Sequence, residues 1–212
     1  AKDRLRSAKA NEGELGELLL YCFLESHLKA PKLLTKMALK TANNDYVKGT
    51  DAVHLLEFSE NCYQIVLGES KTYKSITDAI SKAFTSIHNF KSDPQKRKFE
   101  ISLIDSNLLK ETISDEQYTT IKALLDPSES TVNIKIDDSF GVFIGFDYQY
   151  PAEYDEFDKT IYENVTQIIN DNLASITNKI SEYNLSNYKF YFYFVPLNEI
   201  AKNRKDIIKR IS

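Results

Sequence analysis

Two apolar segments separated by a short polar turn limit what this chain can fold into. The first, GTDAVHLLEF (residues 49–58), alternates so that Asp51, Val53 and Leu55 fall on one side of an extended strand. The second, CYQIVLGESK (residues 62–71), follows after the turn Ser-Glu-Asn. A strand, a tight turn and a second strand predict an antiparallel hairpin. The fold must therefore contain a sheet.

The second strand of this hairpin ends in two opposite charges. Glu69 and Lys71 follow the apolar run 65–67. Counted in steps of two from Ile65, they are alternate residues of one strand, so their side chains leave the same face as that of Ile65. The hairpin brings Asp51, at the beginning of the first strand, beside the end of the second. A surface ion pair on a frayed strand is one interpretation. A site that binds a metal ion and a phosphate is the other.

An apolar helix is predicted before the hairpin, in NEGELGELLLYCFLESHLK (residues 11–29). Asn11 and Glu14 have the spacing of a capping box. The helix is apolar nearly all round, which predicts that it is buried. Glu17 falls among its apolar residues, where a carboxylate is costly unless a cation, a metal or good donors meet it. Capping explains Glu14 more simply, but the sequence does not decide which glutamate belongs to a site.

The remainder of the chain alternates helices and strands. It has no internal repeat and no clear linker, so we expect one domain over residues 1–212. Its core is expected at residues 11–90, and residues 91–212 add a helical insertion, further strands and a basic C-terminal helix. A mixed central sheet flanked by helices, an α/β fold, fits this order. The predicted elements are helices over 75–90, from Asp93-Pro94 to about Ser106, from Ser114 to about Asp126 and over 155–183, strands over 130–136, 140–148 and 187–197, and a helix from Asn198.

Composition narrows the class of protein and its location. The net charge of −4 excludes a uniformly basic nucleic-acid binder, so such a partner needs local basic patches, and residues 89–98 and 202–210 provide two. The two cysteines have no regular spacing, which favours the cytoplasm over a disulfide framework. The longest apolar run, residues 18–24, is too short to cross a bilayer. The chain begins with alanine, and we expect the natural protein to continue upstream.

The residue types at the hairpin suit phosphodiester hydrolysis. Asp51 and Glu69 offer the hard oxygen ligands that Mg²⁺ prefers, and the backbone carbonyl of Ser70 offers another. Glu17 is expected to complete the metal shell or to hold a metal-bound water. Lys71 is expected to contact the phosphate and to help orient or deprotonate the attacking water. His27, His54 and His88 lie on separate elements without the ligand spacing of a zinc site.

The spacing Gly-x-Asp, apolar strand, Glu-x-Lys resembles the PD-(D/E)xK nuclease superfamily, which has the restriction-endonuclease core. The longer run GELGELLLYCFLE…KGTDAVHLLE…IVLGESKTY is similar to HamA, the nuclease-subunit family of the Hachiman anti-phage system, which is related to the AbpA type. The specific part of the resemblance covers about residues 11–87. Thr50 stands where the superfamily name has proline.

This resemblance implies a fold, an activity and a partner. It implies a restriction-endonuclease-like fold and a deoxyribonuclease that depends on Mg²⁺ or Mn²⁺, with Asp51, Glu69 and Lys71 as the catalytic triad and Glu17 as the helix acid. It also implies a superfamily-2 helicase partner similar to HamB. The chain has no Walker motif, so it does not supply ATP-driven unwinding itself.

We therefore expect a metal-dependent DNA endonuclease or nickase of an anti-phage complex, restrained until the helicase engages DNA. The net acidic charge is the reason to expect restraint, because it opposes strong binding of free DNA. A non-catalytic DNA-binding or regulatory subunit on a nuclease-like scaffold is the alternative. The residues themselves leave DNA or RNA open as the substrate.

Overall fold

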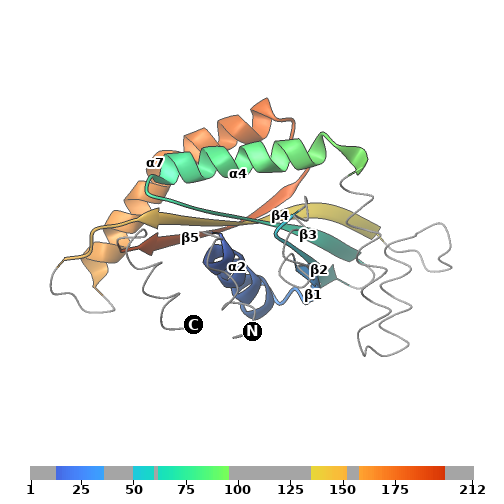
Figure 1. Cartoon of the computed structure of the whole chain (residues 1–212), viewed down its shortest axis with the longest axis horizontal. Helices are drawn as coiled ribbons and strands as arrows, with labels where there is room; N and C mark the ends of the chain where they lie inside the picture. Colours follow the sequence, from blue (N-terminus) through green and yellow to red (C-terminus); the bar gives the residue numbers. More distant parts are fainter. Residues whose placement is uncertain (1–12, 36–49, 60–61, 96–134, 152–157, 199–212) are drawn as a thin grey trace, which may run out of the picture.

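A five-stranded sheet with helices on both faces organises the molecule (Figure 1). The computed structural model describes residues 13–35, 50–59, 62–95, 135–151 and 158–198. The predicted α/β class, with a mixed sheet flanked by helices, is confirmed and is compatible with a restriction-endonuclease-like fold. The elements are α2 (Glu14–Ser26), β1 (Lys32–Thr35), β2 (Ala52–Ser59), β3 (Cys62–Tyr73), α4 (Ile76–Lys91), β4 (Lys135–Asp147), α7 (Lys159–Glu182) and β5 (Lys189–Leu197).

The predicted hairpin forms the antiparallel half of this sheet. β2 and β3 pair with Ala52 opposite Gly68 and Val53 opposite Leu67. Beyond β3 the pairing becomes parallel, from β3 to β4 and from β4 to β5. The four-residue strand β1, which the sequence analysis does not predict, pairs antiparallel with the outer side of β2. β3 is therefore flanked on both sides, as expected for its continuous buried run.

Two long helices cover one face of the sheet and enclose the larger core. Figure 1 shows α4 and α7 side by side above the strands. The ring of Phe84 on α4 lies 5.7 and 6.2 Å from those of Phe190 and Phe192 on β5, measured between centroids. Ser75 is the N-cap of α4, and its side chain accepts a hydrogen bond from the Asp78 amide. The buried residues that β3 and β4 contribute to this face are Ile65, Leu67, Phe140, Val142, Ile144 and Phe146.

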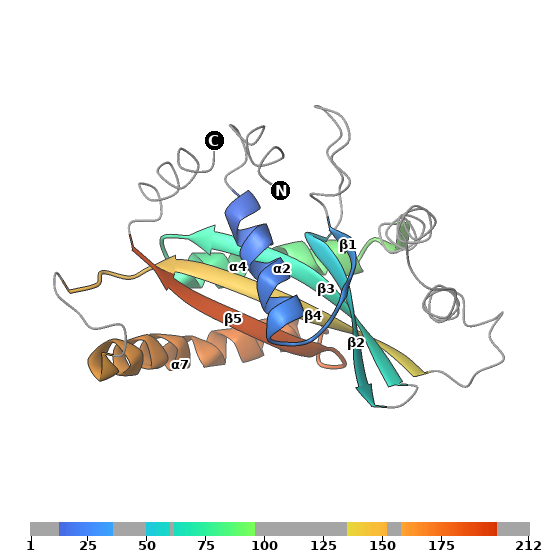
Figure 2. The same cartoon turned by 90° about the horizontal axis from the view of Figure 1, so that it is seen from below.

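The helix α2 crosses the opposite face of the sheet (Figure 2). Leu20 and Leu24 pack there with Val66 and Phe143. Glycines allow the close approach: a Cβ added to Gly141 of β4 would lie 2.8 Å from Leu24 Cδ2. The prediction that this helix is buried all round is wrong, because only the side that faces the sheet is buried and Cys22 is exposed.

Some predicted boundaries move in the structure. Helix α2 begins after Gly13, which has no side-chain capping bond, and Asn11 lies outside the described residues. β2 begins at Ala52 and not at Gly49. The strands predicted over 130–136 and 140–148 meet in one strand, β4, because pairing with β3 continues through Asp137 and Asp138. α7 begins after Asp158, whose carboxylate accepts hydrogen bonds from the next helical amides.

The predictions for several segments lie outside the described residues. The Gln95 amide donates to Asp93 Oδ1 at 3.1 Å, as expected of a helix N-cap. The rest of that helix, the helix predicted from Ser114, and the basic tail are not described. Within the described residues, no helix is long and apolar enough to cross a membrane.

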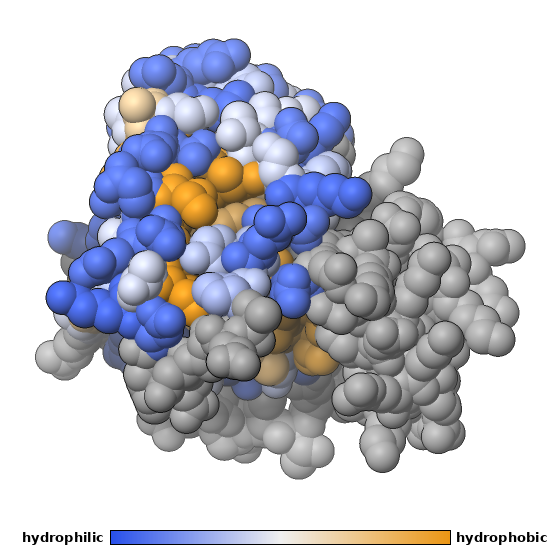
Figure 3. All heavy atoms as spheres, turned by 90° about the vertical axis from the view of Figure 1, so that its left-hand side faces the viewer, coloured by the Kyte–Doolittle hydropathy of each residue, from blue (hydrophilic) through white to orange (hydrophobic). Residues whose placement is uncertain are grey.

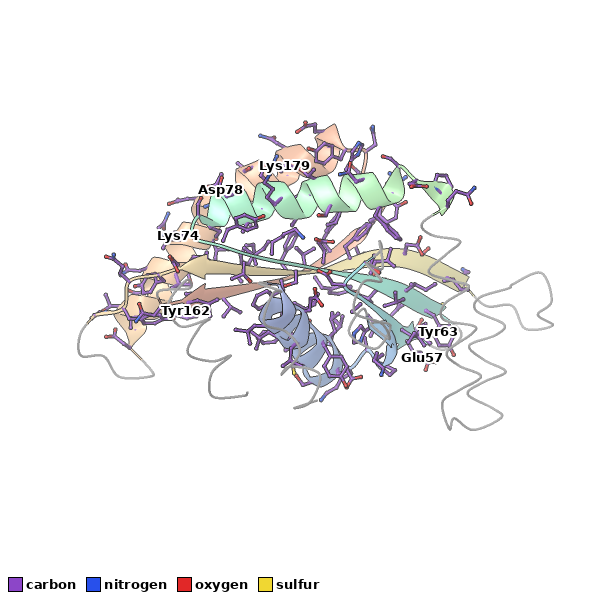
Figure 4. All side chains as sticks on the ribbon, viewed as in Figure 1. Glu57, Tyr63, Lys74, Asp78, Tyr162 and Lys179 are labelled. Carbon is purple, nitrogen blue, oxygen red and sulfur yellow. The ribbon has the colours of Figure 1, made fainter. Side chains whose placement is uncertain are left out.

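The ends of the sheet differ in character. Figure 4 places Glu57 and Tyr63 at one end of the molecule, and Lys74 and Asp78, at the start of α4, toward the other. Figure 3 looks at the latter side, where apolar residues form a strip bordered by hydrophilic ones. Exposed Tyr162 of α7 also lies toward this end (Figure 4). Residues Glu69 to Lys71 belong to the half of β3 nearer this end.

Candidate active site

Asp51 is fixed at the point where β2 begins. Continuing the pairing of Ala52 with Gly68 by one residue places Asp51 opposite Glu69, on the same face of the sheet. The Asp51 amide donates to the Gly68 carbonyl oxygen at 2.9 Å. The Ser70 amide donates to Asp51 Oδ2 at 2.8 Å. Asp51 therefore joins the first strand to the second beyond the end of the regular pairing.

Glu69 and Lys71 form an ion pair on the same face. Lys71 Nζ donates to Glu69 Oε1 and, at 3.3 Å, to the backbone carbonyl oxygen of Ser70. Glu69 is only 7% exposed. Its carboxylate also accepts a hydrogen bond from the side chain of Ser86 on α4. The interpretation of Glu69 and Lys71 as a solvated surface pair is therefore wrong, because Glu69 is buried and Lys71 is only partly exposed.

The charges of the site act strongly on each other. Burial and the nearby Asp51 carboxylate raise the pKa of Glu69 to about 7, against the opposing effect of Lys71 and Ser86. Burial alone would lower the pKa of Lys71, but the carboxylates of Glu69 and Asp51 outweigh burial and raise it. Among the described residues, Glu69 therefore lies close to a second carboxylate, Asp51, as well as to the ammonium of Lys71.

Ser86 is a site residue that the sequence analysis missed. It lies on α4 at helical spacing from the buried Ala79, Ala83 and Phe90. A serine at an inward-facing position of an otherwise apolar stripe is the signal that points to it, because a buried hydroxyl requires a hydrogen-bond partner.

Glu17 reaches the region from the other face of the sheet. Its neighbour Gly16 packs so closely that an added Cβ would lie 2.3 Å from Ser70 Oγ. Helical spacing places Glu17 on the same side of α2 as Tyr21, whose ring lies 5.9 Å from that of His54 on β2. Glu17 is half-buried, and its Oε2 atom is buried. Glu17 thus lies on the β2 side of α2, one turn from Tyr21.

The structure brings together Asp51, Glu69, Ser70 and Lys71, but it does not gather a third carboxylate with them. Among the described residues, no three His, Cys, Asp or Glu side chains form a group that could hold a metal ion. The assignment of Glu17 to the metal shell stays a prediction. The side chain of Glu14, the other candidate, is not described.

The donor atoms present fit Mg²⁺ all the same. Mg²⁺ keeps several waters and is held in phosphoryl-transfer sites by one or two carboxylates together with phosphate oxygens. Asp51 and Glu69 supply two carboxylates, and Ser70, the residue after Glu69, donates its amide to Asp51 and adds a carbonyl oxygen that contacts Lys71. No sulfur or imidazole ligand is involved, which distinguishes this donor set from a zinc site.

A comparison with protein families supports the resemblance noted from the sequence. A family model described as HamA matches residues 1–211, well beyond the hairpin region. The chain belongs to the HamA family. Membership of the HamA family makes the chain a component of Hachiman anti-phage defence. No curated protein and no solved structure matches the chain.

Proposed function

We propose that this HamA-family chain is a metal-dependent nuclease of the PD-(D/E)xK type that cleaves the phosphodiester bonds of DNA. The observation that supports this most is the convergence of Asp51, Glu69 and Lys71 on one face at the end of the hairpin. These are the residue types that phosphodiester hydrolysis requires. Defence against phage gives such an activity a purpose.

Each residue has a separate task in this proposal. Asp51, Glu69 and the Ser70 carbonyl oxygen would hold Mg²⁺ or Mn²⁺, which neutralises phosphate charge and makes a bound water more acidic. Lys71 is in contact with Glu69 and the Ser70 carbonyl, and it would contact a phosphate oxygen of the scissile bond. Ser86 fixes the Glu69 carboxylate from α4. Glu17 would hold a water at the edge of the site.

The same features favour a restrained enzyme. Glu69 is almost inaccessible and Lys71 is engaged in an ion pair. The net charge of −4 opposes tight binding of free DNA by the chain alone. We therefore propose that a superfamily-2 helicase subunit, working in the cytoplasm, delivers DNA to this site.

A plasmid-cleavage assay tests the proposal. The chain is purified with the helicase subunit and incubated with plasmid, Mg²⁺ and ATP. Glu69→Ala/Lys71→Ala should lower the cleavage rate by about a hundredfold or more, a loss of the size seen when a charge-stabilising group is removed from an active site. The matched control is Lys159→Ala/Glu163→Ala, which removes an exposed ion pair of 3.4 Å on α7. Cleavage at the wild-type rate by the site variant would show that these residues are not the active site.

A non-cleaving DNA-binding or regulatory subunit is the second candidate function. The observation that favours it is the lack, among the described residues, of a third carboxylate beside Asp51 and Glu69. If the wild-type complex binds DNA but cleaves neither plasmid nor RNA in Mg²⁺ or Mn²⁺, this second function is correct. Including an RNA substrate also decides which nucleic acid is cut.

A further inference from the structure

The ammonium of Lys71 contacts the oxygen atoms that the proposed function assigns to a metal ion. Its Nζ atom donates to Glu69 Oε1 and to the Ser70 carbonyl oxygen, the latter at 3.3 Å. Asp51, the remaining donor of the set, lies close enough for its charge to act on Lys71. The chain thus supplies its own cation to two of the three donors, and this cation lies near the third.

A divalent ion and this ammonium compete for those groups. Mg²⁺ binds its oxygen ligands at about 2.0–2.1 Å, and a lone pair that binds the ion no longer accepts a hydrogen bond from the ammonium. Two neighbouring cations would also repel each other in a partly buried site. Binding of a metal ion by Glu69 and the Ser70 carbonyl would therefore oppose the contacts of Lys71 with the same two groups.

Charge balance favours this exchange. Within the cluster of Asp51, Glu69 and Lys71, the formal charges of two carboxylates and one ammonium are −2 and +1, which sum to −1. A divalent cation would balance the two carboxylates by itself. Lys71 would then be available to contact a phosphate oxygen.

We propose, on the basis of the proposed function, that Lys71 is an internal counter-ion that competes with the catalytic metal for Glu69 and Ser70. Loading of the site is an exchange of one cation for another. The strength of the Lys71 ion pair then sets the metal concentration at which the site becomes active. Ser86 is not part of the exchange, because it is a neutral donor that contacts Glu69 from α4.

Calorimetric titration of the full chain with Mn²⁺ tests the competition. Lys71→Met removes the ammonium while keeping a side chain of similar length, so Mn²⁺ should bind about tenfold tighter or more, since a hydrogen bond to a charged group no longer has to be broken. Ser86→Ala, the matched control, removes the neutral donor to the same carboxylate and should bind Mn²⁺ with unchanged or lower affinity. Glu69→Ala should abolish the binding.

The outcomes separate this inference from the proposed function. If Lys71→Met binds Mn²⁺ no tighter than wild type, while Glu69→Ala still abolishes binding, the competition is refuted and the metal site stands. If wild type binds no Mn²⁺, or Glu69→Ala binds it equally well, the proposed function fails together with the inference.

A second measurement covers the case in which Lys71→Met does not fold. Reductive methylation of wild-type lysines, followed by peptide mass spectrometry, reports whether the Lys71 amine is engaged. Saturating Mg²⁺ should increase the methylation rate of Lys71 several-fold and leave that of exposed Lys159 unchanged. A Lys71 rate that is unchanged or reduced by Mg²⁺ contradicts the competition.

Discussion

At the residue scale, Asp51 combines a structural and a proposed catalytic task in one carboxylate. Its Oδ2 atom accepts the Ser70 amide at 2.8 Å, so the side chain completes the hairpin where backbone pairing ends. Its charge also acts on both Glu69 and Lys71. A substitution that retains the acceptor but not the charge separates the two tasks.

Asp51→Asn keeps an oxygen for the Ser70 amide, so its free energy of unfolding should stay within about 1 kcal/mol of wild type. Asp51→Ala leaves that buried amide without its acceptor and should lose about 1–3 kcal/mol. Both variants should bind Mn²⁺ about tenfold more weakly or worse, because metal affinity follows the charge of the ligands. Urea unfolding and calorimetry measure the two effects. Equal stability of the two variants would show that the Asp51 side chain has no structural task.

His54 gives the stability of the fold a dependence on pH that is separate from the active site. The ring is fully buried beneath α2, Nδ1 bonds to the Ala30 carbonyl oxygen at 2.8 Å, and Nε2 has no hydrogen-bond partner among the described residues. Burial lowers the pKa of His54, although the Ala30 carbonyl and Glu25 act in the opposite direction and Lys32 assists burial. The folded protein therefore holds His54 neutral.

The sign of the pH effect follows from the lowered pKa. The unfolded chain binds a proton below about pH 6.5 while the folded one resists it, so stability is lost as the pH falls below that value, by at most about 1.4 kcal/mol per pH unit. His54→Asn, which retains a donor for Ala30, should show a smaller loss of unfolding free energy between pH 7.5 and 5.5. His27→Asn is the control, because His27 is exposed. An identical pH dependence in His54→Asn and wild type would contradict the assignment.

At the element scale, the close packing of α2 on the sheet depends on glycine. A Cβ on Gly16 would lie 2.3 Å from Ser70 Oγ and 3.0 Å from Thr72 Oγ1, and one on Gly68 would lie 3.1 Å from Leu20 Cδ2. The helix is thereby held against the strand segment that carries Glu69. Larger side chains at these positions would separate the two elements.

Gly16→Leu should destabilise the fold by about 2 kcal/mol or more, because the added side chain overpacks a contact that has no space. Cys22→Leu, on the exposed side of the same helix, should change the free energy of unfolding by no more than about 0.5 kcal/mol. Urea denaturation monitored by circular dichroism gives both values. A Gly16→Leu variant as stable as Cys22→Leu would mean that α2 does not pack on Ser70.

The same scale shows what the sequence could predict. The hairpin and α4 were predictable because alternation, a tight turn and an apolar stripe at helical spacing are local signals. β1 was not predictable, because a strand of four residues carries little local signal and forms here by pairing with the outer side of β2. The one-sided burial of α2 was also not predictable from the sequence, because a helix that is apolar nearly all round gives no sign of which side packs on the sheet. The contact of Ser86 with Glu69 was not predictable either, because it depends on which side of α4 faces β3.

At the scale of the whole molecule, the sheet unites strands from residues 32 to 197, and its centre is built from parallel pairs that join distant segments. Such pairing cannot be read from local periodicity, which explains why the order of strands was not predicted. The convergence of Asp51 with Glu69 was predictable, because one hairpin produces it. The position of Glu17 was not, because it depends on the packing of α2 across the opposite face.

The net charge of −4 predicts that the chain alone binds DNA weakly. For a labelled duplex at about 150 mM salt, fluorescence anisotropy should give a dissociation constant in the non-specific range of about 10⁻⁶ M or weaker. Adding the helicase subunit should tighten binding of the complex. Nanomolar binding by the isolated chain at this salt concentration would refute the proposal that a partner has to deliver the DNA.

The central claim is that Asp51, Glu69 and the Ser70 carbonyl oxygen hold a divalent metal ion. The most direct measurement is the anomalous diffraction of manganese in crystals of the chain soaked with Mn²⁺. The account predicts an anomalous peak about 2.0–2.3 Å from an oxygen of each carboxylate, the distances of such ions to oxygen ligands, with Lys71 turned away from Glu69. Crystals in which Mn²⁺ binds elsewhere would contradict it, whereas Lys71 remaining on Glu69 at saturating Mn²⁺ would contradict only the competition between Lys71 and the metal ion.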